Sequence, residues 1–335
     1  FSEASGASEI GEIYGARHGV EGLLAGDWVD LRRQAAAVWR RLAKQPAAVL
    51  GTSRHSPSSD ERDKAMTILR QHGVRFLFII GGNDSAETGR TMAVESRARG
   101  HDLSAIVVPK TIDNDLVETD HSPGYGSAAR FVALATMGAG RDAEAMGRAA
   151  PITVIEVMGR DAGWLAAASG LARREERDAP HLICIPEAPV GEDWFVARIE
   201  DAYARYGFAV AVVSENARGP EGVLGGQSEP WFVDDFGHPY YDGPARYLAG
   251  IVSRRLGVRA RYEKPGTAQR SFIPTTSTSD MREAEMAELR DQLSRGEAAL
   301  SDAEERLVGE RRAREADVEA LQEELDEVRA ESNLL

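Results

Sequence analysis

The chain has 335 residues, of which 42% are hydrophobic and 28% charged, an ordinary composition for a globular protein. Its 54 acidic and 40 basic side chains give a net charge of −14, and no apolar run approaches the roughly 18–20 residues that span a bilayer, so we expect neither nucleic acid nor membrane as a partner. A single cysteine, Cys184, excludes an intrachain disulfide and favours a reducing, cytoplasmic location.

Five short apolar runs rich in β-branched residues are predicted strands, and helix-like stretches separate most of them. Near-continuous apolar strands are typical of a parallel sheet that is covered on both faces. Their alternation with helices predicts a doubly wound α/β fold, in which ligands bind just past the carboxyl ends of the strands. In chain order the elements are helix 60–72, strand 74–80, helix 86–100, strand 105–108, helix 126–138, strand 152–157, helix 163–174, strand 181–185 and strand 208–213.

The first predicted strand ends in Gly81-Gly82-Asn83-Asp84-Ser85, directly before a predicted helix. Paired glycines let a ligand approach the backbone closely, and the start of a helix offers free N–H groups to an anion. This loop is therefore a candidate phosphate site. The alternative is a tight strand-to-helix turn in which Ser85 caps the helix.

The second predicted strand ends in a segment that carries Lys110, Thr111, Asp113 and Asp115. The two carboxylates are two residues apart, so in an extended segment they point the same way. Two carboxylates in one cleft can divide their roles, one taking a proton and the other holding Mg²⁺, while Lys110 neutralises phosphoryl oxygens. The alternative is a polar surface loop with an Asx turn.

Residues 286–335 form the last predicted element, an acidic segment in which apolar side chains recur every seven residues. This spacing predicts a helical, coiled-coil-like tail. Self-association is one interpretation, and a solvated helix without a partner is the other. The repeat positions are Met286, Leu293, Leu300, Leu307, Leu321, Val328 and Leu335, with Arg314 interrupting them.

Three ordered motifs resemble the phosphofructokinase family: Gly-Gly-Asn-Asp-Ser at 81–85, Pro-Lys-Thr-Ile-Asp-Asn-Asp at 109–115 and Glu-Val-Met-Gly-Arg-Asp-Ala-Gly-Trp at 156–164. Segments 50–54, 185–187 and 269–270 fit the same family, so the resemblance covers about residues 10–285. It implies two doubly wound Rossmann-like domains with mainly parallel sheets. The expected divisions are a phosphoryl-donor domain of residues 1–127 with 269–285, a sugar-phosphate domain of residues 128–268, and the tail 286–335.

The resemblance implies a glycolytic, Mg²⁺-dependent and reversible transfer of a phosphoryl group to the 1-hydroxyl of fructose 6-phosphate. Asp84 and Lys110 resemble the residues of the branch that uses pyrophosphate. The physical argument points the same way, because a carboxylate at Asp84 would repel the α-phosphate of a nucleotide. Asn83 departs from the family, which usually has an acid there. Two alternatives stay open: an ATP-dependent 6-phosphofructokinase, and a non-catalytic relative that acts as a scaffold through its tail.

The resemblance also implies individual roles. Asp113 would be the general base, with Asp115 holding Mg²⁺ or orienting Asp113, Thr111 positioning the transferring phosphoryl group and Lys110 stabilising its charge. Arg261 matches an arginine that reaches in from a neighbouring subunit, which implies a homodimer or homotetramer. The expected donor-binding residues are Gly82, Asn83, Asp84, Ser85 and Arg54; the metal ligands are Asp84 and Asp115; the sugar-phosphate ligands are Met158, Gly159, Arg160, Glu215, Arg261, Lys264 and Arg270.

Family members normally open with a strand and a glycine-rich loop that holds the donor phosphates, and this sequence starts after that point. The heptad tail stands where the family has its closing segment. We therefore expect these 335 residues to have reduced activity by themselves.

Overall fold

A computed structural model describes residues 11–42, 48–220, 222–225, 230, 232–234, 237, 239–240 and 242–272. The predicted tail 286–335, and with it the predicted coiled coil, lies outside the described residues. None of the described helices combines the length and the apolar composition that a bilayer span requires.

The elements before residue 110 are β1 (Tyr14–Ala16), α1 (Val20–Ala25), β2 (Trp28–Asp30), α2 (Ala36–Leu42), α3 (Ser59–Gln71), β3 (Phe76–Gly81), α4 (Asn83–Ala98) and β4 (Ser104–Pro109). The middle elements are α5 (Tyr125–Met146), η2 (Gly147–Ala149), β5 (Ile152–Val157), α6 (Trp164–Ala168), η3 (Ser169–Ala172), β6 (Leu182–Cys184), α7 (Glu192–Tyr206) and β7 (Ala209–Ser214). The last are β8 (Arg218–Gly219), β9 (Gly222–Val223), β10 (Phe232–Val233), β11 (Pro239–Tyr240), α8 (Pro244–Leu256), β12 (Ala260–Glu263) and α9 (Ala268–Ser271).

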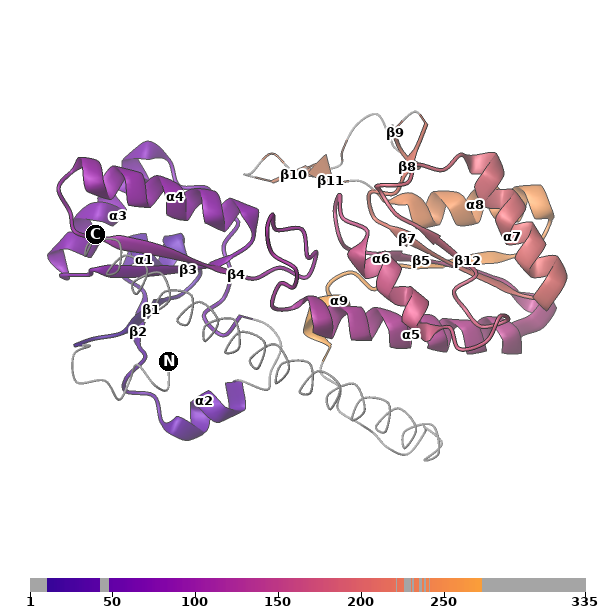
Figure 1. Cartoon of the computed structure of the whole chain (residues 1–335), viewed down its shortest axis with the longest axis horizontal. Helices are drawn as coiled ribbons and strands as arrows, with labels where there is room; N and C mark the ends of the chain where they lie inside the picture. Colours follow the sequence, from indigo (N-terminus) through magenta and orange to yellow (C-terminus); the bar gives the residue numbers. More distant parts are fainter. Residues whose placement is uncertain are drawn as a thin grey trace, which may run out of the picture. The chain divides into compact units, whose positions relative to one another are not determined.

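The larger sheet has the order β12-β5-β7-β6, and all of its strand pairs are parallel. Helices α7 and α8 pack on one face, and α5 and α6 pack on the other (Figure 1). Every residue of β5 and β7 is buried, as expected for strands that are covered on both sides. The predicted α/β fold with parallel sheets is therefore confirmed here.

The smaller parallel sheet pairs β3 with β4, so that Gly81 lies opposite Pro109. Its core is formed with α3 and α4 around Met66, Leu69 and Met92. On the other face Phe76 and Phe78 are 62% and 56% exposed. The expectation that both faces are covered is therefore wrong for this sheet within the described residues, because α3 and α4 both lie on one side.

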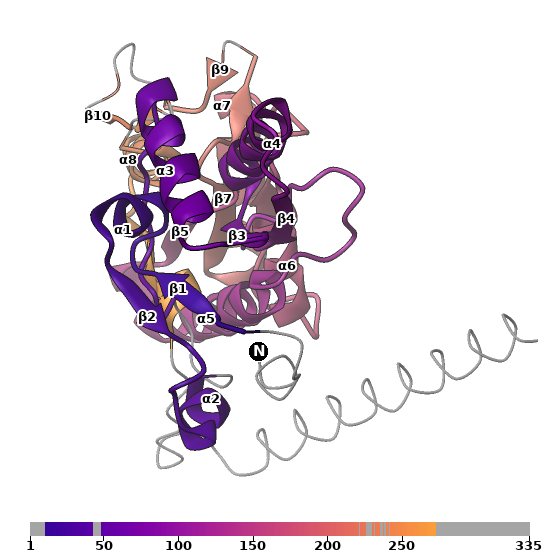
Figure 2. The same cartoon turned by 90° about the vertical axis from the view of Figure 1, so that its left-hand side faces the viewer.

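The N-terminal elements were not predicted from the sequence. Strands β1 and β2 pair antiparallel, and α1 between them packs beside α3 (Figure 2). These elements are only three to six residues long, too short for a periodic pattern to emerge. The assignment of the two parallel sheets to separate Rossmann-like domains, with the boundaries given above, stays a prediction.

Candidate active site

Two of the predicted loops meet at the carboxyl ends of β3 and β4. The in-register pairing of Gly81 with Pro109 starts both loops at the same level. A side chain at Gly82 would have its Cβ 3.8 Å from Cβ of Thr111, so the first loop passes close to the second. The arrangement brings the candidate phosphate loop and the carboxylate-bearing loop together, as the sequence predicts.

The first loop lets a ligand approach its backbone closely at the start of α4. A Cβ at Gly81 would lie 2.0 Å from Oγ of Ser85, so glycine is required there. Gly82 is the N-cap and no side chain caps the helix, which leaves the first-turn N–H groups available to an anion. The alternative in which Ser85 caps the helix is therefore wrong. Asp84 lies half-buried in the first turn.

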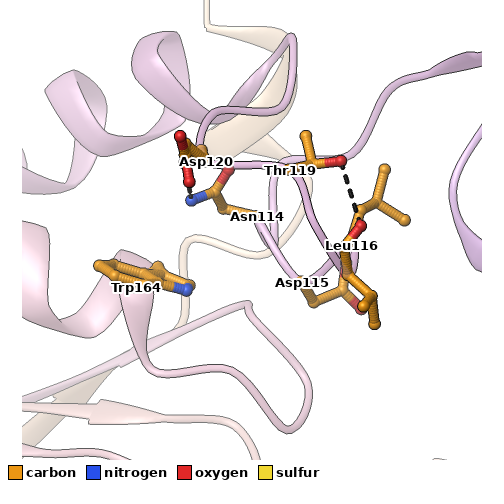
Figure 3. A pocket seen from close by; sticks show the side chains of 7 residues that line it. Asn114, Asp115, Leu116, Thr119, Asp120 and Trp164 are labelled. Atoms are coloured by element: carbon orange, nitrogen blue, oxygen red, sulfur yellow. Dashed lines mark hydrogen bonds between the residues drawn. The ribbon is translucent and has the colours of Figure 1, made fainter.

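Asn114 shapes the second loop, and the sequence analysis gave it no role. Its backbone is left-handed, with φ of 57°, a conformation that asparagine tolerates better than most residues. Its buried side chain accepts a hydrogen bond from the Ser122 N–H at 2.7 Å. It also donates one to the Asp120 carbonyl at 3.1 Å, which Figure 3 shows. The premise of an extended segment is thus wrong, because the chain turns between Asp113 and Asp115.

Asp113 is the most perturbed carboxylate of this region. Its side chain is 14% exposed, and Nε of Arg160 lies 4.0 Å from its Oδ2. Burial raises the pKa of Asp113 to about 6; the charges of Glu215 and Asp115 add to the rise, and those of Arg160 and Arg270 oppose it. A carboxylate with such a pKa is ionised at neutral pH and accepts a proton more readily than an ordinary aspartate.

Asp115 is joined to the first loop by a hydrogen bond. Nδ2 of Asn83 donates to its Oδ2 at 3.0 Å. Carboxylate and amide oxygens are the ligand types that Mg²⁺ takes, usually one or two from the protein and the rest from phosphate and water. This pair fits such a site, and no group of three or more acidic, histidine or cysteine side chains among the described residues offers a self-sufficient metal cage. Asp84 makes no side-chain hydrogen bond to either partner within the described part of the chain.

Two cations flank the donor side. Lys110 is exposed at the end of β4, and its ammonium has no ion-pair partner among the described residues. Arg54 is half-exposed and pairs with the buried carboxylate of Asp234 at 2.9 Å, so its guanidinium is held on the segment after β10. Lys110 is thus available to a phosphate, whereas Arg54 already has a carboxylate partner.

Met158, Gly159 and Arg160 follow β5, beside the end of β7. Arg160 has a left-handed φ of 48°, and its N–H donates to Oε1 of Glu215 at 2.9 Å. Such a backbone in a non-glycine residue is uncommon and costs free energy, which the hydrogen bond to Glu215 offsets. Burial raises the pKa of Glu215, while the backbone hydrogen bond opposes the rise.

Gln269 anchors α9 to this loop. Its Oε1 accepts a hydrogen bond from the Met158 N–H at 3.1 Å, and its side chain is buried. The neighbouring Arg270 therefore lies near enough to Asp113 to lower its pKa. The sequence analysis placed Gln269 in a family motif without a role, and its contact with a residue 111 positions away has no local signal.

Lys264 and Arg261 contact groups outside this cluster. Lys264 Nζ lies 2.7 Å from Oε1 of Glu156. Arg261 forms an ion pair with Asp142 on α5 and a hydrogen bond to the Thr153 hydroxyl at 3.3 Å. The structure does not bring Arg261 to Asp113, and its role across a subunit interface stays a prediction.

A pocket of about 450 Å³ lies on the outer side of the Asn114 turn. In Figure 3 the ring of Trp164, at the start of α6, stands across the pocket from Asp115. Trp164 is 53% exposed, so the pocket opens beside the candidate catalytic loop. The remaining lining residues are Leu116, Val117, Thr119 and Asp120.

Known proteins resemble this chain in sequence and in structure. The family described as phosphofructokinase matches residues 4–288. A pyrophosphate--fructose 6-phosphate 1-phosphotransferase of Xanthomonas campestris pv. campestris (strain B100) is 36% identical over 299 residues, covering 84% of this chain and 70% of that protein. An ATP-dependent 6-phosphofructokinase 2 of Streptomyces coelicolor is 32% identical over 267 residues, covering 79% and 73%.

Among solved structures, a pyrophosphate-dependent phosphofructokinase from Nitrosospira multiformis is similar, with a TM-score of 0.71 and 32% identity. The match covers 81% of this chain and 65% of that one. The chain thus spans about two thirds of the length of these relatives.

Proposed function

The chain belongs to the phosphofructokinase family, and we propose that it transfers a phosphoryl group from pyrophosphate to the 1-hydroxyl of fructose 6-phosphate. The observation that carries the proposal is the buried carboxylate of Asp113, raised in pKa and set between Arg160 and Asp115. The names of the most similar relatives support the donor and the acceptor. The products are fructose 1,6-bisphosphate and phosphate, and the reaction is reversible.

In the proposed step Asp113 accepts the proton of the 1-hydroxyl group. The sugar oxygen then forms a bond to one phosphorus of pyrophosphate, and the bridging P–O bond breaks to release phosphate. Thr111 lies beside Asp113 and accepts the N–H of that residue at 3.1 Å, so its hydroxyl is held at the loop where the phosphoryl group passes. Positioning and charge neutralisation dominate phosphoryl transfer, and this loop supplies both.

Charges at the donor loops favour pyrophosphate. The N-terminus of α4, with Gly82 and Ser85, offers N–H groups, and the exposed Lys110 offers an ammonium. Asp115 and Asn83 would hold Mg²⁺, with Asp84 next to them as a further carboxylate. When bound, Mg²⁺ neutralises charge on the phosphoryl oxygens.

The sugar-phosphate side would be formed by Met158, Gly159, Arg160, Glu215 and Arg270. The guanidinium of Arg160 matches a phosphate in geometry and charge. Lys264 and, from a neighbouring subunit, Arg261 complete the proposed set. Among the described strands β12 lies at the edge of its sheet, where a second copy can approach, and we propose a cytoplasmic homodimer or homotetramer.

Donor choice is the first testable consequence. A coupled assay with fructose 6-phosphate should show turnover with pyrophosphate and little or none with ATP. The double variant Asp84→Gly/Lys110→Gly should lose about a hundredfold in kcat/KM for pyrophosphate, because a charge that contacts phosphate is removed, and should gain relative to wild type with ATP.

Asp102→Gly, on an exposed loop before β4, is the matched control and should keep the wild-type ratio of the two donors. ATP is the second candidate donor, supported by the similarity to the S. coelicolor relative. If the wild-type chain prefers ATP over pyrophosphate, the proposed donor is wrong and the ATP-dependent reaction is supported.

A further inference from the structure

Glu156 is a buried carboxylate that the proposed reaction does not use. It lies in β5, between two fully packed helix layers, and is 2% exposed. A charged side chain in such surroundings is costly unless compensating groups surround it. The identity of those groups indicates what Glu156 does.

The first compensating group is the N-terminus of α8. The Ala245 N–H donates to Oε2 of Glu156 at 3.2 Å. Gly243, the N-cap, has φ of 87°, and a Cβ there would lie 2.2 Å from the same oxygen. The helix therefore starts directly on the carboxylate, where its dipole favours negative charge.

The second compensating group is Lys264. Its Nζ lies 2.7 Å from Oε1 of Glu156 and donates to the Asp242 carbonyl at 3.1 Å. The lysine side chain is 44% exposed, in contrast to the 2% of its partner. The contact with Glu156 is an ion pair without hydrogen-bond geometry, since Oε1 of Glu156 has no hydrogen-bond partner among the described residues. An ammonium group can donate three hydrogen bonds, so the ion pair and the one hydrogen bond hold it in place and leave capacity for a ligand on the solvent side.

Glu156 also neighbours the proposed sugar-phosphate ligands. Glu215 follows β7, which pairs with β5, and holds the backbone of Arg160. The charge of Glu156 contributes to the raised pKa of Glu215, and that of Lys264 opposes it. Lys264 therefore stands within electrostatic reach of the loop that is proposed to bind the sugar.

We propose that Glu156 is a positioning residue, which fixes the ammonium group of Lys264 so that it can bind the phosphate of the acceptor sugar. This inference rests on the proposed function for the identity of the acceptor. It assigns Glu156 no contact with substrate. Its effect is to hold a flexible lysine side chain in place before the sugar phosphate arrives.

The test measures binding of fructose 6-phosphate to the full chain by calorimetry, without donor, and steady-state kinetics in parallel. Glu156→Gln keeps the shape of the side chain and removes its charge. We expect its dissociation constant and KM for fructose 6-phosphate to rise about tenfold, with kcat at saturation within about threefold of wild type. Lys264→Gln should have the same effect, and the double variant should add little to either, because the two residues act as one unit.

Glu95→Gln is the matched control, since Glu95 pairs with Arg62 at 3.0 Å on helices α4 and α3. It should leave the affinity for fructose 6-phosphate unchanged. Wild-type affinity in folded Glu156→Gln, or additive effects in the double variant, would overturn the proposal. If Glu156→Gln does not fold, wild-type affinity in Lys264→Gln overturns it equally.

Failure of the proposed function gives a different pattern. If the wild-type chain neither binds fructose 6-phosphate nor turns it over, fructose 6-phosphate is not the acceptor and the proposed function is wrong. If the wild type binds and converts fructose 6-phosphate but both variants keep its affinity, only the positioning role of Glu156 is wrong.

Discussion

Residues of the candidate catalytic loop interact with groups that are distant in the sequence. Asp113 owes its raised pKa first to burial and then to Glu215, 102 positions later, and Arg160 opposes the rise. The family resemblance placed these residues in one site, and each of them follows a predicted strand. The sequence did not predict the role of Asn114, whose left-handed backbone sets the conformation of the loop. An asparagine between two aspartates gives no signal beyond a general turn preference.

The raised pKa of Asp113 has a consequence for stability. On folding, the pKa of Asp113 rises from its ordinary value of 3.8 to about 6. The folded chain therefore binds the proton more tightly than the unfolded chain does. The resulting stabilisation is complete below about pH 4 and is lost as the pH rises through about 6. Asp113→Asn avoids this loss, so at pH 7.5 the variant should exceed wild type in free energy of unfolding by about 1–3 kcal/mol.

Urea unfolding at several pH values measures the difference. The two curves of free energy against pH should diverge between about pH 4 and 6 and run parallel above that range. A variant that is less stable than wild type at pH 7.5 would mean that the ionised carboxylate stabilises the fold, contrary to its burial.

At the scale of elements, hydrophobicity predicted the five strands β3 to β7 but not the short edge strand β12, and it did not predict how many faces of each strand are covered. The runs at β3 and β5 look alike in the sequence, yet β5 is buried throughout whereas Phe76 and Phe78 of β3 are exposed on one side. Coverage depends on where helices pack, and this is a property of chain topology that local periodicity does not encode.

The exposed face of β3 predicts a contrast between two phenylalanines. Phe78→Ala should lower the free energy of unfolding by less than about 1 kcal/mol, because the residue is 56% exposed. Phe195→Ala removes a fully buried ring of α7 and should cost about 3–5 kcal/mol. Thermal and urea unfolding measure both. Equal costs would show that a second copy or another part of the chain covers Phe78 in solution.

For the whole molecule, the ordered sequence motifs are sufficient to indicate the family, and the match over residues 4–288 confirms it. Several motifs spaced through a chain are more specific than any one of them, because each loop must follow the carboxyl end of its own strand. The contacts between strand ends could not be predicted in this way. Gln269 to Met158 and Lys264 to Glu156 join residues more than one hundred positions apart.

The most direct test of the account follows the phosphorus atoms themselves. ³¹P NMR of the chain with pyrophosphate, fructose 6-phosphate and Mg²⁺ should show pyrophosphate decaying while phosphate and a new phosphomonoester grow in equal amounts. Asp113→Asn should slow this conversion about a thousandfold, because the proton acceptor is lost. Conversion by the variant at the wild-type rate, or pyrophosphate consumed by wild type without a new ester, would contradict the account.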